Sequence, residues 1–143
     1  MVNQPVPVSF IVPVPIPAVA PVVFINCDIF PFIDQIISGE KVFETRNKNT
    51  LGRFVGQWVY LAETRKGRPP VVKCIVFIDD CMDCRLEKIW DILRSETMVP
   101  VGSKYDWTNE TRVKWLYSIA DAVPVSPFIP SGRRHGRVWM EME

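Results

Sequence analysis

Six prolines within the first 21 residues are the feature that most constrains the fold of this chain. The segment is otherwise rich in Val and Ile and has no charged side chain before Asp28, a composition also found in membrane spans and signal peptides. Proline costs about 3 kcal/mol in a helix interior, so this spacing argues against a spanning helix. A signal peptide needs a basic region before its apolar stretch, and no Lys or Arg precedes this one. We therefore expect an extended, polyproline-like arm over residues 1–21 and a cytoplasmic protein without a membrane segment.

The remaining residues, 22–143, form a second kind of sequence that carries every charged side chain of the protein. A chain of this length buries roughly two-thirds of the surface that it exposes when unfolded, which is enough for one domain with its own core. The formal net charge of +1 argues against a protein that binds polyanions by bulk charge alone.

The four cysteines do not indicate a metal site. Cys81 and Cys84 have the CxxC spacing of zinc ribbons and redox motifs, but Cys27 and Cys74 stand alone and His135 is the only histidine. A tetrahedral zinc site needs a second ligand pair. We expect ordinary thiols, and neither a metal nor a cofactor.

Hydrophobic periodicity predicts an α+β domain. Alternating and β-branched segments indicate strands, and apolar residues at helical spacing indicate helices. The strands are expected over 22–27, 41–46, 54–62, 71–78, 113–123 and 137–142, and the helices over 31–38 and 85–98, with a further helix start near Thr108. Five to six strands with two to three helices predict a small β-barrel.

The charges of the domain are unevenly distributed. Residues 41–73 contain eight basic and two acidic side chains, whereas residues 79–96 contain three basic and six acidic ones. A basic surface with Trp58, Tyr60 and Trp107 available for stacking has the composition of a site for single-stranded RNA or for a base. Solvated loops beside core aromatic residues explain the same composition equally well.

The most specific local pattern is formed by Lys41, Glu44 and Arg46, which follow a predicted helix that ends at Gly39. Residues two apart on a strand lie on one face, about 7 Å apart. Lys41 and Arg46 can orient a phosphate or a carbonyl group, while Glu44 accepts a proton or a base amino group. The alternative is a salt-bridged trio that fastens the strand to its neighbouring loop.

Other basic and aromatic residues complete the set of candidates. We expect Arg53, Lys104, Tyr105 and Trp107 to bind the ligand, the last three as a wall or lid after the second helix, although both aromatic residues also suit a core. The basic turn over 133–137 can contact phosphates.

The motif Gly39-x-Lys41-x-x-Glu44-x-Arg46, after a strand and an apolar helix, resembles the signature of the ASCH family in the PUA-like superfold. The strands expected over 57–62 and 71–78 and the closing segment 136–141 fit the same pattern. The resemblance covers residues 22–143 and leaves the arm outside. It implies a small β-barrel with a cleft beside the motif, and binding of RNA or a nucleotide.

The resemblance also implies an enzymatic alternative. One branch of the family resembles an amidohydrolase that deacetylates N4-acetylcytidine with the motif Lys, a Thr three residues later and a downstream Glu. Lys41 matches the motif Lys, but Glu44 occupies the Thr position, and alternation places Thr45 on the opposite strand face. Asp79 or Asp80 is the candidate downstream carboxylate. A ribonuclease activity is attributed to other members.

Three hypotheses follow for the whole chain. The first is a binding module for RNA or a nucleotide that uses the cleft beside the motif. The second is a hydrolase of a modified nucleoside or of RNA, with Lys41 and Glu44 as catalytic residues. The third is a protein-interaction domain whose proline-rich arm docks into an aromatic groove of a partner.

Overall fold

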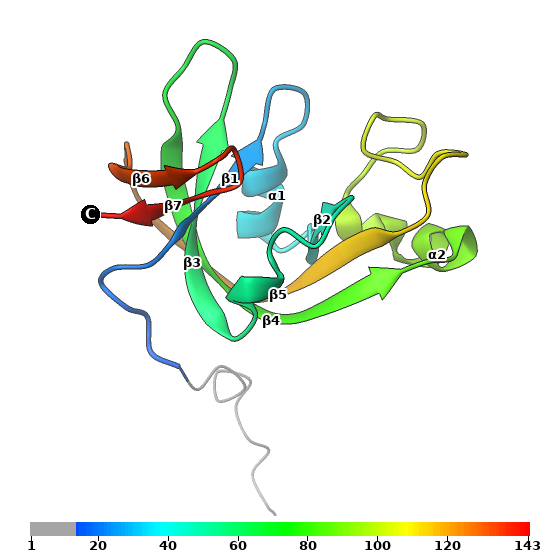
Figure 1. The fold of residues 1–143 in the computed structure, drawn as a ribbon, viewed down its shortest axis with the longest axis horizontal. Helices are drawn as coiled ribbons and strands as arrows, with labels where there is room; N and C mark the ends of the chain where they lie inside the picture. Colours follow the sequence, from blue (N-terminus) through cyan, green and yellow to red (C-terminus); the bar gives the residue numbers. More distant parts are fainter. Residues whose placement is uncertain (1–13) are drawn as a thin grey trace, which may run out of the picture.

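The computed structural model describes residues 14–143, so most of the expected arm, residues 1–13, lies outside the described residues. Its elements follow one another along the chain as labelled in Figure 1. They are β1 (Val22–Asn26), α1 (Phe32–Ser38), β2 (Phe43–Arg46), the short 3₁₀ helix η2 (Gly52–Phe54), β3 (Gln57–Thr64), β4 (Val71–Cys84), α2 (Glu87–Thr97), β5 (Lys114–Phe128), β6 (Gly132–His135) and β7 (Trp139–Met142).

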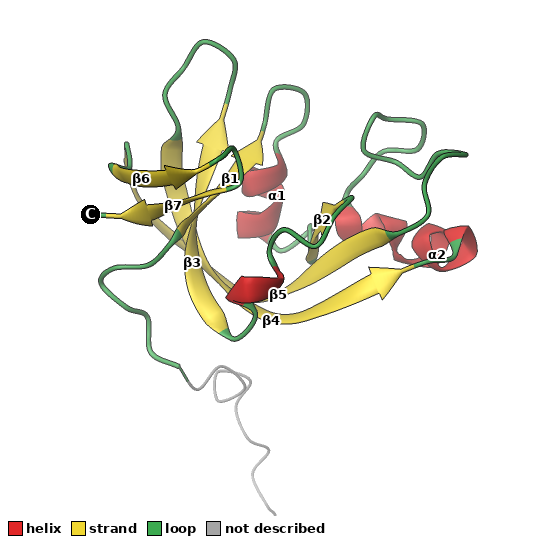
Figure 2. Ribbon diagram, viewed as in Figure 1, coloured by secondary structure: helices red, strands yellow, loops and turns green. Residues whose placement is uncertain are grey.

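The strands form one seven-stranded sheet in the order β2-β5-β4-β3-β1-β7-β6 (Figure 2). The pair β1–β3 is parallel, and the other pairs are antiparallel. The predicted α+β class is confirmed, with seven strands rather than five to six. Among the described residues no pairing joins β2 to β6, so the sheet is not closed and the predicted barrel is not confirmed.

The additional strand comes from the C-terminal segment, where one strand over 137–142 was expected. The chain instead forms a hairpin, in which Arg134 of β6 pairs with Met140 of β7. Gly136, in the turn, has φ +64°, a left-handed conformation that side chains disfavour. The basic residues of the predicted turn are therefore divided between β6 and the turn itself.

Strand β5 continues past residue 123, where the strand was expected to end, and runs to Phe128. Pro124 pairs with Cys74 of β4, while β2 covers the other side of β5 only from Trp115 to Ser118. At Pro124 that other side has no neighbouring strand among the described residues, and such an edge position tolerates proline.

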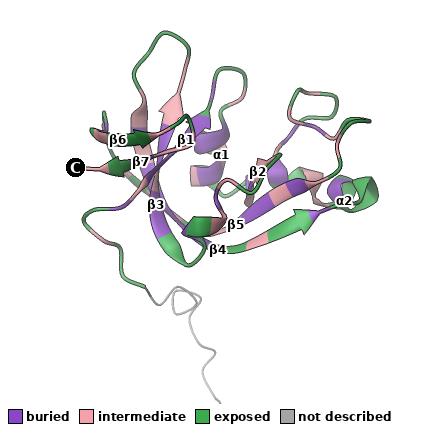
Figure 3. Cartoon of the chain, viewed as in Figure 1, coloured by how far each residue is buried: buried purple, intermediate pink, exposed green. Residues whose placement is uncertain are grey.

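Helix α1 lies against the sheet and supplies a large part of the main core (Figure 3). Its buried side chains are Phe32, Ile33 and Ile36, and it ends at Gly39, whose φ is +85°. The core also takes apolar side chains from β1, β3 and β4. The apolar stripe over 31–38 thus predicted both the helix and its buried face.

The segment before β1 lies against β3. Trp58 donates from Nε1 to the carbonyl of Val14 at 2.8 Å, and the hydroxyl of Tyr60 donates to the carbonyl of Ala18 at 3.3 Å. Ala20 is buried in the same apolar cluster as Trp58. Trp58 is only 5% exposed, so the prediction that it is available for stacking on a ligand is wrong.

Helix α2 follows β4 and confirms the helix expected over 85–98, whereas the residues after Thr108 form turns and no helix. Neither α1 nor α2 is long and apolar enough to cross a membrane. Cys81 and Cys84 both lie on β4. Because side chains three apart on a strand point to opposite faces, their CxxC spacing does not bring the two thiols together.

Candidate functional site

Lys41 lies between α1 and β2 and points inward. It is 2% exposed, and its Nζ donates to the carbonyl of Thr97 at the end of α2. The same nitrogen lies 3.8 Å from Glu44 Oε1 and 4.4 Å from the centroid of the Phe32 ring. Burial lowers the pKa of Lys41, and the charge of Glu44 partly opposes that shift. Lys41 therefore joins β2 to both helices.

Glu44 and Arg46 share one face of β2, as the alternation predicted. Arg46 donates to Glu44 Oε2 from Nη2 at 3.0 Å and from Nε at 3.1 Å. Its Nη2 also donates to the carbonyl of Phe24 on β1 at 2.9 Å. The structure thus brings the three motif residues together, in a row of ion pairs with Glu44 in the middle.

A cavity of about 500 Å³ opens beside this face of β2. Glu44 and Arg46 line it, whereas Lys41 does not and lies behind Glu44. The walls come from β1, α1, β2, β3, β5 and the β6–β7 hairpin and from the loops beside them. The lining residues are Phe24, Ile25, Asn26, Phe32, Glu44, Thr45, Arg46, Asn47, Thr64, Tyr105, Lys114, Arg134 and Arg137.

The cavity has an excess of positive charge. Arg46, Lys114, Arg134 and Arg137 line it together with a single carboxylate, that of Glu44. The guanidinium carbon of Arg134 lies 4.8 Å from the centroid of the Phe24 ring. Cationic and aromatic side chains thus line the same cavity, which suits a ligand with an anionic part and a flat part.

Lys114 connects the cavity to the loop after α2. It is 4% exposed, and its Nζ donates to Asn47 Oδ1 and to the carbonyl of Tyr105, both at 2.8 Å. Burial lowers its pKa, and the charge of Asp106 partly opposes that shift. These bonds fix two further wall residues, Asn47 and Tyr105.

Of the other predicted binding residues, the cavity includes only Tyr105. Arg53 lies over the ring of Trp139, 5.0 Å from its centroid, in a separate hollow. Lys104 lies beside Tyr105, with Nζ 5.1 Å from the ring centroid, outside the cavity walls. Trp107 packs against Trp90, with ring centroids 6.5 Å apart, in the core role weighed as its alternative.

The sequence interpretation missed several wall residues, among them Asn26, Asn47, Thr64 and Lys114. One signal was available for two of them. Asn26 ends β1 and Thr64 ends β3, and these parallel strands pair Asn26 directly with Thr64. Carboxyl ends of parallel strands meet at one edge of a sheet, where ligands often bind.

No protein-family model matches this sequence, and a search of curated proteins finds no match. Solved structures do match the fold. A crystal structure of ASCH from Zymomonas mobilis superposes with a TM-score of 0.62 at 17% identity, over 76% of this chain and 72% of that chain.

Two mutant structures of the Zymomonas mobilis protein superpose with TM-scores of 0.61 and 0.60 at the same identity, over 76% of this chain and 72% and 74% of theirs. At this level of identity the comparison shows the fold alone. The chain has the fold of an ASCH domain, as the resemblance of its motif implied.

Proposed function

We propose that this protein is a binding module for RNA or a nucleotide, and that the ligand occupies the cavity beside β2. The observation that carries the proposal is the lining of that cavity, in which four cationic side chains and three aromatic rings surround one carboxylate. Its volume of about 500 Å³ lies within the range of small-molecule and cofactor sites, roughly 300–1,000 Å³. The ASCH fold supports the same class of ligand.

The chemistry of the walls suggests how such a ligand is oriented. Arg134 and Arg137 are exposed at the hairpin, and guanidinium groups bind phosphate oxygens in a bidentate manner. The rings of Phe32 and Tyr105, whose centroids lie 5.4 Å apart, offer apolar surface to a base. Glu44 Oε1 lies 3.8 Å from Lys41 Nζ and accepts no hydrogen bond from the described residues, so it keeps capacity to accept one from a base amino group.

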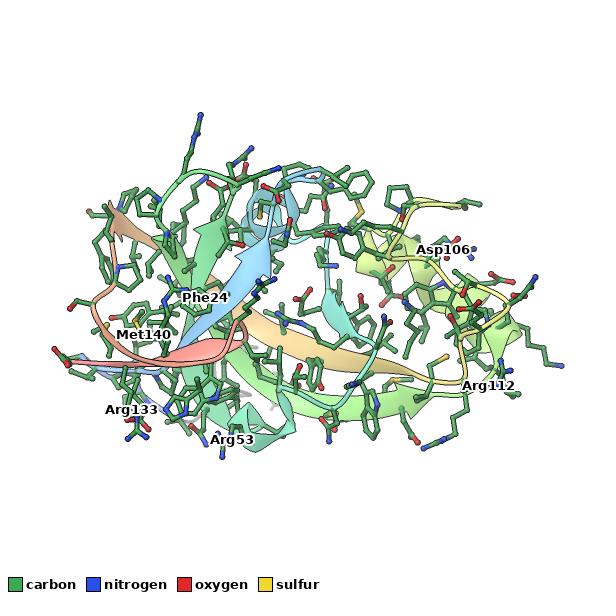
Figure 4. The ribbon with its side chains drawn as sticks, turned by 45° about the horizontal axis from the view of Figure 1, so that its top comes forward. Phe24, Arg53, Asp106, Arg112, Arg133 and Met140 are labelled. Atoms are coloured by element: carbon green, nitrogen blue, oxygen red, sulfur yellow. The ribbon has the colours of Figure 1, made fainter. Side chains whose placement is uncertain are left out.

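Fluorescence anisotropy with labelled single-stranded RNA tests the proposal. Replacing both Arg134 and Arg137 by Ala is expected to weaken binding and to reduce the dependence of affinity on salt, by about 0.7 in the log-log slope for each phosphate that is no longer neutralised. Arg112→Ala is the matched control, because Arg112 is exposed and lies at the opposite end of the molecule from Arg53 and Arg133 in Figure 4. An RNA affinity that changes neither with salt nor with the substitution of Arg134 and Arg137 would contradict the proposal.

A hydrolase is the second candidate, favoured by one observation: Glu44, a buried carboxylate, faces the cavity with one oxygen free of hydrogen bonds from the described residues. Asp79 and Asp80 lie exposed on β4 and outside the cavity walls, so Glu44 is the residue proposed to transfer the proton. Release of acetate from N4-acetylcytidine, abolished by Glu44→Gln, is the expected result. Absence of turnover at high protein concentration would remove the amidohydrolase form of this candidate.

A further inference from the structure

A second hollow lies on the other side of the β6–β7 hairpin. Its volume is about 330 Å³, and Arg53, His135 and Trp139 contribute to its lining. The rings of His135 and Trp139 are stacked, with centroids 4.0 Å apart and planes at 5°. The guanidinium carbon of Arg53 lies 5.0 Å from the centroid of the same Trp139 ring. Three flat groups are therefore held together at a surface where Arg53 is exposed.

The same two segments bound this hollow and the central cavity. The loop after β2 contributes Asn47 to the cavity, and Asn49 and Thr50 to the second hollow. The hairpin contributes Arg134 to the cavity and His135 to the hollow, because neighbouring residues of β6 point to opposite faces. Figure 4 shows Phe24, in the wall of the cavity, and Arg53 on opposite sides of the hairpin. The hairpin and this loop thus contribute walls to both sites.

The surface between the two sites is basic. Arg133, Arg134 and Arg137 are exposed on the hairpin, and Arg53 is exposed beyond it. The acidic side chain on this part of β7 is Glu141, which pairs in register with Arg133 and lies 3.1 Å from His135 Nε2. A polyanion that leaves the cavity over the turn thus meets four arginines and one carboxylate.

We propose that the ligand is a single strand of RNA longer than one nucleotide, which passes from the cavity across the β6–β7 turn into the second hollow. This inference rests on the proposed function and makes it specific. Bases of single-stranded RNA stack on aromatic rings and on arginine guanidinium planes, and basic grooves follow the backbone. The Arg53 guanidinium and the His135 ring provide the stacking faces, and Arg133 and Arg137 contact the phosphates between the two sites.

The test compares a nucleoside monophosphate with an RNA of roughly eight nucleotides, a length within the site sizes of single-strand binders. The RNA is expected to bind more tightly. Arg53→Ala and His135→Ala should each lower the affinity for the RNA at least about fivefold, which is the low end of the contribution of one stacked base. Neither change should alter the affinity for the monophosphate. Arg46→Ala should lower the affinity for both ligands, whereas Arg112→Ala should lower the affinity for neither.

Glu141→Gln should have the opposite effect, because it removes the carboxylate beside the second hollow. It should raise the affinity for the RNA and leave that for the monophosphate unchanged. The inference is overturned if the RNA binds no more tightly than the monophosphate, or if Arg53→Ala affects both ligands alike; the proposed function then stands. If neither ligand binds, the proposed function and the inference fail together.

Discussion

Glu44 and Asp106 are both buried carboxylates, 8% and 6% exposed, in opposite situations. Asp106 Oδ1 accepts from Trp90 Nε1 at 2.7 Å, from Arg94 and from the backbone of Trp107, and Oδ2 accepts from the backbone of Gly102. Glu44 accepts hydrogen bonds only from Arg46 among the described residues, through Oε2. One carboxylate is saturated inside a loop, and the other has an open oxygen at a cavity.

The difference separates a structural charge from a candidate functional one. Burial alone would raise the pKa of Asp106, but its hydrogen bonds outweigh burial and lower the pKa to about 2. That network holds the loop after α2 in place. The partners of Glu44 allow it to remain buried, but its carboxylate can accept further hydrogen bonds. A ligand in the cavity can supply the donor.

The largest effect is expected from Asp106→Asn. The change removes the charge to which Trp90, Arg94 and two backbone N–H groups donate, although Arg94 keeps Asp91 as a carboxylate partner at 2.7 Å. Hydrogen bonds to a charged group are worth about 1.5–3 kcal/mol, so we expect a loss of about 2–3 kcal/mol. Urea denaturation should show that loss in the free energy of unfolding, while the folded variant still binds RNA. A stability equal to that of the unchanged protein would show that the charge of Asp106 does not stabilise the fold.

The second test is how the free energy of unfolding changes at acidic pH. The folded-state pKa of Asp106 is below its ordinary value, so the stabilisation is complete above about pH 4 and is lost as the pH falls towards 2. The shift corresponds to about 2 kcal/mol. Unfolding midpoints of the wild-type protein and the Asp106→Asn variant should therefore converge as the pH is lowered. If the stabilities of the two proteins fell in parallel with pH, Asp106 would not be the group with the lowered pKa.

Lys114→Met tests the connection between the two regions. Asn47 and the carbonyl of Tyr105 lose their donor, which should lower the free energy of unfolding by about 1–2 kcal/mol. The cavity also loses a cation, so the salt dependence of RNA binding should fall by about 0.7 in slope. A change in stability with an unaltered salt slope would assign Lys114 to the fold alone.

Glu44→Gln should lower the free energy of unfolding by about 1–2 kcal/mol, because the amide retains an acceptor for Arg46 while Arg46 and the buried Lys41 lose the charge of Glu44. Ligand preference should change as well. Replacing a charged acceptor by a neutral one should lower the affinity for cytidine monophosphate relative to uridine monophosphate by about fivefold. An unaltered preference, with a large loss of stability, would make Glu44 a structural residue like Asp106.

Local patterns in the sequence predicted elements whose determinants are close together in the chain. The apolar stripe and Gly39 predicted α1, and the alternation over 41–46 placed Glu44 and Arg46 on one face. Patterns that depend on a neighbour were misread. Trp58 resembled a free stacking residue because nothing local shows that the carbonyl of Val14 accepts its N–H.

The sequence by itself determined the helices, most strands, the ASCH-like motif and the shared face of Glu44 and Arg46, because each depends on periodicity over a few residues. Only the tertiary structure decided which charges surround the cavity. Lys114 and Arg134 reach it from segments far from β2 in the chain, and Lys41, the first cation of the motif, is turned away from it. The inward position of Lys41 depends on Thr97, which packing alone brings to it.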